Sequence, residues 1–125
     1  MAPAGIRLTA VTLSAPDPAR LARFYSRLLG WPISLEEPDY VVVPDPGGGV
    51  GLAFELEDNH VHPIWPARPG GQQMQLHLEF VVDDLQRGLS HALHCGATMA
   101  EYQAHHHMRV CLDPAGHPFC IKVES

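Results

Sequence analysis

The sequence contains little positive charge: 8 Lys and Arg residues stand against 14 Asp and Glu residues in 125, for a formal net charge of −6. No basic patch or stripe is present, which argues against a nucleic-acid partner. The chain also lacks an apolar run of the roughly 20 residues that cross a bilayer. Residues 1–13 lack the long apolar stretch of a secretory signal. We therefore expect a cytoplasmic protein without a membrane partner.

Cysteine is scarce as well, with three residues that show no CxxC spacing. An odd number of separated cysteines favours reduced, mostly buried thiols at Cys95, Cys111 and Cys120. The Walker, GxGxxG, GxSxG and HExxH patterns are absent from the sequence. The chain therefore carries no motif of nucleotide binding, of a serine hydrolase or of a zinc protease.

Apolar residues recur at helical spacing in two stretches, which predicts two amphipathic helices. An Asp opens each stretch as a candidate N-cap and a Gly ends it. The positions are Asp17 and Gly30 in the first helix, and Asp83-Asp84 and Gly96 in the second. The first Asp of the second stretch follows Asp17 by 83 − 17 = 66 residues, which indicates an internal repeat.

Strand-like segments surround both helices in the same order. They are 6–13, 32–36, 40–44 and 50–57 in the first half, and 75–82, 97–103, 108–112 and 118–123 in the second. Strict alternation in 75–82 places His77 and Glu79 together on one strand face. The sequence predicts an α+β fold of two tandem βαβββ modules, about 1–58 and 74–125, joined by a linker at about 59–73. Their mixed sheet is expected to curl around one ligand cup.

This layout resembles the vicinal oxygen chelate superfamily, which includes glyoxalase I, extradiol dioxygenases and bleomycin-resistance proteins. The resemblance is carried by DPARLARFYSRLLGW (17–31), LHLEFVVDDL (76–85) and RVCLDPAGHPFC (109–120), and with the repeat it covers nearly the whole chain. The segment DPAGHPFC, together with Trp65-Pro66, is similar to the glyoxalase-like subgroup. One fold hosts many functions, so the activity has to be argued from the site.

The resemblance implies four metal-ligand positions in the cup, one on the first and last strand of each module. They fall on Ala10, Glu55, His77 and Cys120. Ala10 offers no ligand atom, and a thiolate at Cys120 shifts the preference toward zinc and other soft ions. Three ligands suffice for a catalytic zinc site, so Glu55, His77 and Cys120 keep that alternative open. We expect no metal, with one divalent ion, zinc or nickel, as the alternative.

Aromatic residues near the expected cup favour a protein that binds a small organic ligand, because such pockets are mostly apolar with a few polar groups. The expected ligand-binding residues are Trp31, Phe54, Trp65, Glu79, Tyr102, Arg109 and Phe119. One alternative is a metal-dependent lyase of glyoxalase type, with Glu55 as catalytic base and His77 as catalytic proton shuttle or metal ligand. Others are a drug-sequestering resistance protein and an auxiliary domain that acts on protein partners. The resemblance also implies a homodimer.

The chain has nine histidines, and several of them have two interpretations. His105, His106 and His107 predict an exposed hairpin turn, with a lid or a second metal site as the alternative. His60 and His62 face either the pocket or the solvent. His77 itself has a structural alternative, in which it lines the pocket and bonds to Glu79 or Glu55. His117 is expected to bond to Asp113 and to fix the turn before the last strand.

Overall fold

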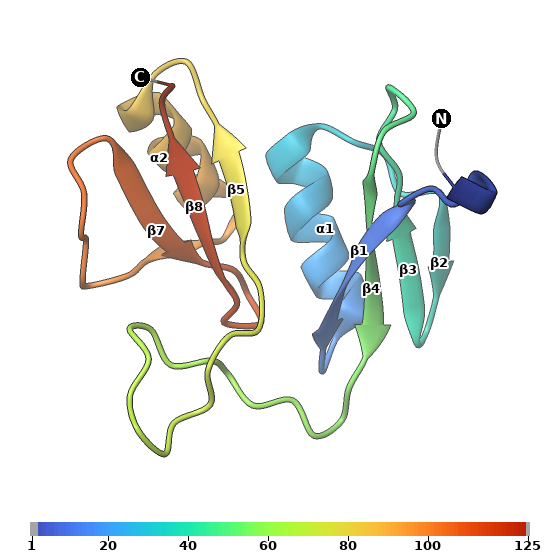
Figure 1. Cartoon of the computed structure of the whole chain (residues 1–125), viewed down its shortest axis with the longest axis horizontal. Helices are drawn as coiled ribbons and strands as arrows, with labels where there is room; N and C mark the ends of the chain where they lie inside the picture. Colours follow the sequence, from blue (N-terminus) through green and yellow to red (C-terminus); the bar gives the residue numbers. More distant parts are fainter. Residues whose placement is uncertain (1–2, 125) are drawn as a thin grey trace. The chain divides into compact units, whose positions relative to one another are not determined.

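The computed structural model describes residues 3–124, and the chain divides into two compact units at Asp58–Asn59. Within residues 3–124, each unit contains a four-stranded mixed sheet and one α-helix (Figure 1). The order of elements is strand, helix and three strands, twice over. The predicted α+β class and the two tandem βαβββ modules are therefore confirmed. None of the helices described in residues 3–124 is long and apolar enough to span a membrane.

The first unit orders its strands β1-β4-β3-β2. Strands β1 and β4 are parallel, and the other neighbours are antiparallel. Its elements are a short 3-10 turn (Pro3–Gly5), β1 (Ala10–Ala15), α1 (Pro18–Leu29), β2 (Leu35–Glu37), β3 (Tyr40–Val43) and β4 (Gly51–Leu56). The strand expected at 6–13 begins only at Ala10, where pairing with β4 starts, and the side chains of Ile6 and Leu8 before it are exposed.

Helix α1 has the bounds that its sequence predicts. The carboxylate of Asp17 accepts a hydrogen bond from the Arg20 amide at 3.1 Å, which caps the first turn. Gly30 ends the helix in the left-handed region at φ 71°, where a residue without Cβ is unstrained. The apolar stripe packs against β3 and β4 and forms the core of this unit, with fully buried Leu21, Phe24, Tyr25, Val41, Val43 and Phe54.

The second unit repeats this topology with the order β5-β8-β7-β6, in which β5 and β8 are parallel. Its elements are β5 (Leu78–Val81), α2 (Leu85–Cys95), β6 (Thr98–Met99), β7 (Met108–Leu112) and β8 (Pro118–Lys122). The N-cap of α2 is Asp84, not Asp83, and its carboxylate accepts from the Arg87 amide at 3.1 Å. Asp84 follows Asp17 by 84 − 17 = 67 residues, so the repeat is one residue longer than the sequence suggested.

The strand expected at 97–103 is reduced to the two residues of β6. The side chain of Gln103 explains this, because its amide takes over the bonds that a longer strand would make. Its Nε2 donates to the carbonyls of Ala100 (2.7 Å) and Val110 (3.0 Å), and its Oε1 accepts from the Val110 amide at 2.9 Å. A side chain here satisfies backbone groups that would otherwise be paired along the strand.

The linker 59–73 belongs to the second unit and is held against its sheet. A hydrogen bond joins His60 Nε2 and the Ala115 carbonyl at 2.7 Å. The ring of His62 lies over Gly116, which has φ +85° and whose missing Cβ would come within 2.6 Å of His62 Nδ1. Further along, Trp65 packs against buried Val110 and Cys120. The linker therefore forms part of the wall above one face of the second sheet.

Candidate functional site

The second sheet has two chemically different faces. Helix α2 covers an apolar face, where Phe80 and Phe119 meet edge to face with their ring centroids 5.8 Å apart. Because side chains alternate along a strand, their neighbours project from the other side. Glu79 on β5, Cys120 on β8 and Val110 on β7 are register partners and form one row across three strands there. We call this side the pocket face.

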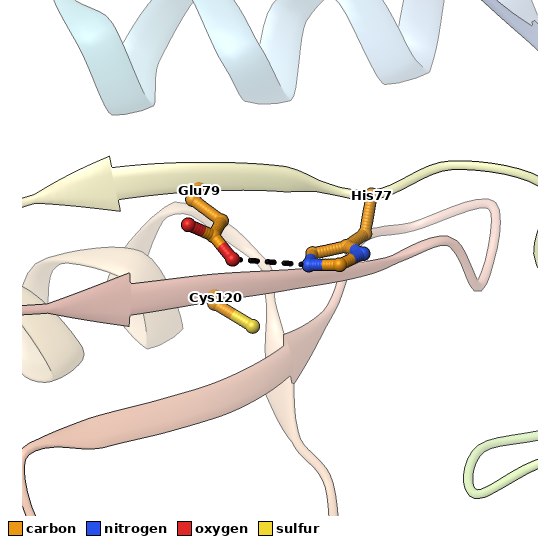
Figure 2. A group of neighbouring side chains, drawn as sticks. All are labelled: His77, Glu79 and Cys120. Carbon is orange, nitrogen blue, oxygen red and sulfur yellow. Dashed lines mark hydrogen bonds and ion pairs between the residues drawn. The ribbon is translucent and has the colours of Figure 1, made fainter.

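Three side chains with possible metal-ligand atoms gather on the pocket face (Figure 2). His77 precedes β5 by one residue, and its Nε2 lies 3.1 Å from Glu79 Oε2. Cys120 is buried beside them, and the ligand atoms of His77, Glu79 and Cys120 all lie within 4.8 Å of one another. The sequence left Glu55, His77 and Cys120 as the alternative set of metal ligands, and the structure groups His77 and Cys120 with the carboxylate of Glu79.

Lys122 completes the polar part of the site. Its Nζ donates to Glu79 Oε1 at 2.9 Å, so that the two carboxylate oxygens of Glu79 are shared between Lys122 and His77. The hydrogen bond from Lys122 and the bond with His77 lower the pKa of Glu79, and the nearby Glu79 carboxylate raises the pKa of Lys122. At neutral pH this is therefore a carboxylate held between an ammonium group and an imidazole.

The cysteines are free thiols and all three are buried, as their scarcity predicted. Burial, and then the negative charge of Glu79, raise the pKa of Cys120, while Lys122 opposes this shift. Burial raises the pKa of Cys111 on the helix side of the sheet to about 11. Neither thiol is a thiolate at neutral pH on its own, so the site contains no free sulfur nucleophile.

A pocket of about 220 Å³ lies over the row on the pocket face. Its wall is mainly apolar, and His77 and Glu79 supply the charged and polar groups. The lining residues are Trp65, Met74, His77, Glu79, Ala104, His105, Met108, Val110, Pro118 and Cys120. The indole Nε1 of Trp65 is buried and has no hydrogen-bond partner among residues 3–124.

A second, larger hollow of about 510 Å³ shares His105 and Met108 with this pocket. His107, Lys122 and Glu124 also line it. The rings of His105 and His107 stack with their centroids 6.5 Å apart, so the two side chains point the same way. Both residues are exposed in the turn before β7.

Glu55, the predicted catalytic base, lies on β4 of the first unit. Its Oε1 accepts from Ser14 Oγ at 3.5 Å. The two sheets have equivalent registers: Ser14 pairs with Glu55 as Val81 pairs with Lys122. Glu55 therefore corresponds to Lys122, and Cys120 corresponds to Ala53. The cluster on the pocket face is complete without Glu55, because Glu79 supplies its carboxylate.

Two predicted ligand-binding residues are core residues instead. Phe54 is fully buried and stacks on Tyr25 with the ring centroids 5.6 Å apart, and Phe119 is buried on the helix side of β8. Each stands next to a residue of the opposite face, Glu55 or Cys120. Since neighbours in a strand point to opposite sides, both members of such a pair cannot line one cup.

The other predicted ligand-binding residues are divided. Trp65 and Glu79 line the pocket. Arg109 holds the turn before β7, because its Nη1 donates to the carbonyls of His105, His106 and Met108. Tyr102 is exposed, and Trp31 is half-buried in the first unit, where its carbonyl accepts from Ser26 Oγ.

His117 contributes to the turn before β8 through its backbone amide. Its amide donates to Asp113 Oδ1 at 3.0 Å, and the Ala115 amide donates to the same oxygen at 2.9 Å. The sequence analysis did not single out Met74, Met108, Val110 or Pro118 as pocket residues. The signal that would have found Val110 is the strand register, which places it opposite Cys120.

Comparison with known proteins agrees with this architecture. A family model described as a glyoxalase-like domain matches residues 10–122. No curated protein matches the sequence. A glyoxalase/bleomycin resistance/dioxygenase family enzyme from Burkholderia phytofirmans PsJN is 20% identical, with a TM-score of 0.68 over 94% of this chain and 98% of that one.

Two further solved structures show the same fold. A glyoxalase-related enzyme from Fulvimarina pelagi is 19% identical, with a TM-score of 0.67 over 94% of this chain and 88% of that one. A possible glyoxalase from Bacillus cereus is 13% identical, with a TM-score of 0.65 over 94% and 99%. The chain therefore belongs to the glyoxalase-like domain family, within the vicinal oxygen chelate superfamily.

Proposed function

We propose that this protein binds a small, largely apolar organic molecule in the pocket of its second unit. The observation that supports this most is the composition of the pocket wall. Trp65, Met74, Met108 and Val110 provide apolar contact, and the His77–Glu79 pair provides polar contact on the same wall. A mostly apolar wall with a few convergent polar groups is the usual character of a small-molecule site.

The pocket also limits the kind of ligand. Its volume of about 220 Å³ lies below the roughly 300–1,000 Å³ of sites for drug-sized molecules, which favours a compact ligand. The indole of Trp65 offers a flat surface. The thioethers of Met74 and Met108 adapt to irregular shapes. A compact planar ring suits these groups.

The metal site of metal-dependent relatives does not fit the residues present. Ala10 has no ligand atom at the position expected on β1. At the fourth position stands Cys120, a buried protonated thiol, in place of a hard oxygen or nitrogen ligand. The proposed binding function therefore has no step that passes through a metal ion.

The His77–Glu79 pair supports proton transfer as a second candidate function, as in a lyase or isomerase. A carboxylate in hydrogen-bond contact with an imidazole fixes the orientation of the ring. Another solved structure of this fold is an oxidase, ChaP-H2, at 19% identity and a TM-score of 0.64. A likeness at that identity concerns the fold alone, so binding remains the first proposal.

The binding proposal is tested with the intrinsic fluorescence of Trp65. The chain has two tryptophans, so Trp31→Phe leaves the pocket residue as the single emitter. We expect small neutral aromatic compounds to change its emission saturably and to raise the melting temperature, as binding to the native state requires. Cationic and anionic analogues of the same size then define the charge preference.

A pair of exposed alanines provides the control. Ala104 lines the pocket, whereas Ala67 does not, and both are exposed. We expect Ala104→Leu to weaken binding by steric block and Ala67→Leu to leave it unchanged. Equal binding by both variants, or no saturable response to any compound, would contradict the proposal.

A further inference from the structure

We infer that His77, Glu79 and Cys120 form a binding site for a thiophilic divalent ion such as Zn²⁺, contained entirely in the second unit. This goes beyond the proposed ligand binding and does not depend on it. It differs from the four-position site implied by the family resemblance, because Glu79 replaces ligands from the first unit. The geometry of the three side chains supports it (Figure 2).

The backbone sets the positions of all three ligands. Glu79 and Cys120 are direct register partners on the parallel strands β5 and β8. His77 stands two residues before Glu79, and its Nε2 is already 3.1 Å from Glu79 Oε2. A tetrahedral zinc ion with N, O and S ligands needs donor separations of about 3.3–3.8 Å. The ligand atoms of the three residues lie up to 4.8 Å apart. The side chains of His77 and Glu79 are more than a third exposed and are free to rotate, so we expect rotation to bring their ligand atoms into that range.

The ligand types select the class of ion. One imidazole, one carboxylate and one thiolate carry two negative charges together, which a divalent ion neutralises. The sulfur disfavours Mg²⁺, Ca²⁺ and Mn²⁺ and favours Zn²⁺ and similar ions. On binding, the S–H bond of Cys120 breaks, the sulfur–metal bond forms, and the proton leaves to the buffer. All three residues line the pocket, so a fourth coordination position would open into it.

Lys122 is an internal competitor for this site. Its ammonium group holds Glu79 Oε1 at 2.9 Å and supplies the positive charge that an ion would otherwise supply. An ion has to share Glu79 with Lys122 or displace it. We therefore expect the replacement of Lys122 with an uncharged residue of similar length to strengthen ion binding. If the Lys122–Glu79 pair had only a structural role, the replacement would not strengthen it.

The test uses tag-free full-length protein, freed of metal by a chelator, in the absence of any organic ligand. Co²⁺ replaces Zn²⁺ in the titration because a cobalt–thiolate bond absorbs in the near ultraviolet. We expect one equivalent of Co²⁺ to produce this band and Zn²⁺ to displace it. Cys120→Ala should abolish the band and weaken Zn²⁺ binding by at least about tenfold, as loss of a direct ligand costs no less than loss of a residue behind one.

Matched variants separate this site from other metal-binding side chains. Cys111→Ala removes a buried thiol from the opposite face of the same sheet and should leave the band unchanged. Glu79→Gln, at a more exposed position, should weaken binding even if Cys120→Ala fails to fold. Lys122→Met should tighten it severalfold. A triple alanine variant of 105–107 should keep the band.

Two results would overturn the inference. One is Zn²⁺ binding that Glu79→Gln and Cys120→Ala both leave at full strength. The other is a Co²⁺ complex without thiolate absorption, which would place the ion on ligands other than Cys120. Failure here leaves the organic-ligand proposal intact, because the fluorescence titration of that proposal involves no metal ion.

Discussion

The two units share a strand register but place different chemistry on it. In the first unit the row across β1, β4 and β3 is Thr12, Ala53 and Val42; the equivalent row in the second is Glu79, Cys120 and Val110. The next pair along is Ser14 and Glu55 in one unit and Val81 and Lys122 in the other. A repeated scaffold thus carries the charged and sulfur-containing groups of the candidate site in its second copy.

The packing shows the opposite asymmetry. Helix α1 buries five residues, including the aromatic rings of Phe24 and Tyr25, whereas α2 buries Ala92 and Cys95. Large buried side chains contribute most to stability, because each removes a large apolar area from water. The comparison suggests that the first unit supplies more of the packing energy and the second supplies the site.

The largest expected effect is in the core of the first unit. Phe24 follows its N-cap Asp17 by seven residues, and His91 follows Asp84 by seven. Phe24 is fully buried, while His91 is exposed. Phe24→Ala should lower the free energy of unfolding by about 3–5 kcal/mol, and His91→Ala should change it by less than about 0.5 kcal/mol. Urea denaturation measures both changes in the free energy of unfolding. Similar losses in the two variants would contradict the conclusion that the first unit supplies more of the packing energy.

A medium effect is expected from pH in the core of the second unit. Cys111 lies opposite Phe119, as Val43 lies opposite Leu52 in the first unit. Burial raises the pKa of Cys111 from 9.0 to about 11. Between these values the unfolded chain has lost the thiol proton and the folded chain keeps it, so stability falls as pH rises. The loss should reach about 2 kcal/mol by pH 11.

Cys111→Ala isolates this contribution from the other groups that titrate at high pH. Unfolding curves of the variant and the wild type between pH 8 and 11 should differ in slope, with the variant flatter. Parallel curves would show that the thiol proton does not contribute to the stability of the folded unit.

The smallest expected effect comes from transferring the cluster to the first unit. Ala10, Thr12 and Ala53 occupy the positions equivalent to His77, Glu79 and Cys120. The triple variant Ala10→His, Thr12→Glu and Ala53→Cys should bind a second, weaker equivalent of Co²⁺ with thiolate absorption. Stoichiometry that stays at one would show that the register alone does not create the site.

The elements that could be predicted from the sequence are those determined by neighbouring residues. Helix α1 has its cap, its apolar stripe and its terminal glycine within one stretch, so its bounds followed directly. The strand at 97–103 could not be predicted, because the amide of Gln103 replaces it through bonds that depend on the folded position of Val110. The pattern of neighbouring residues in the sequence does not reveal a hydrogen bond whose geometry is set by the fold.

The same distinction holds for the site. His77 and Glu79 were placed on one face by alternation alone, and their contact followed. The pairing of Glu79 with Lys122 depends on two strands that are 41 residues apart and parallel. The prediction places Phe54 and Phe119 in the cup together with their sequence neighbours Glu55 and Cys120. Strand geometry excludes this, because neighbouring side chains of a strand point to opposite faces. The rule was available in the sequence and would have corrected both assignments.

The close approach of His62 to Gly116 has a consequence for engineering this family. Any side chain at 116 would collide with the imidazole at 2.6 Å, so the path of the linker and the residue in the distant turn are sterically coupled. A designer who exchanges the 59–73 segment for that of a relative, to obtain a differently shaped wall, should transplant residues 113–117 with it. The two segments would have to be exchanged together, although Asp113, where the turn begins, lies 113 − 62 = 51 positions after His62.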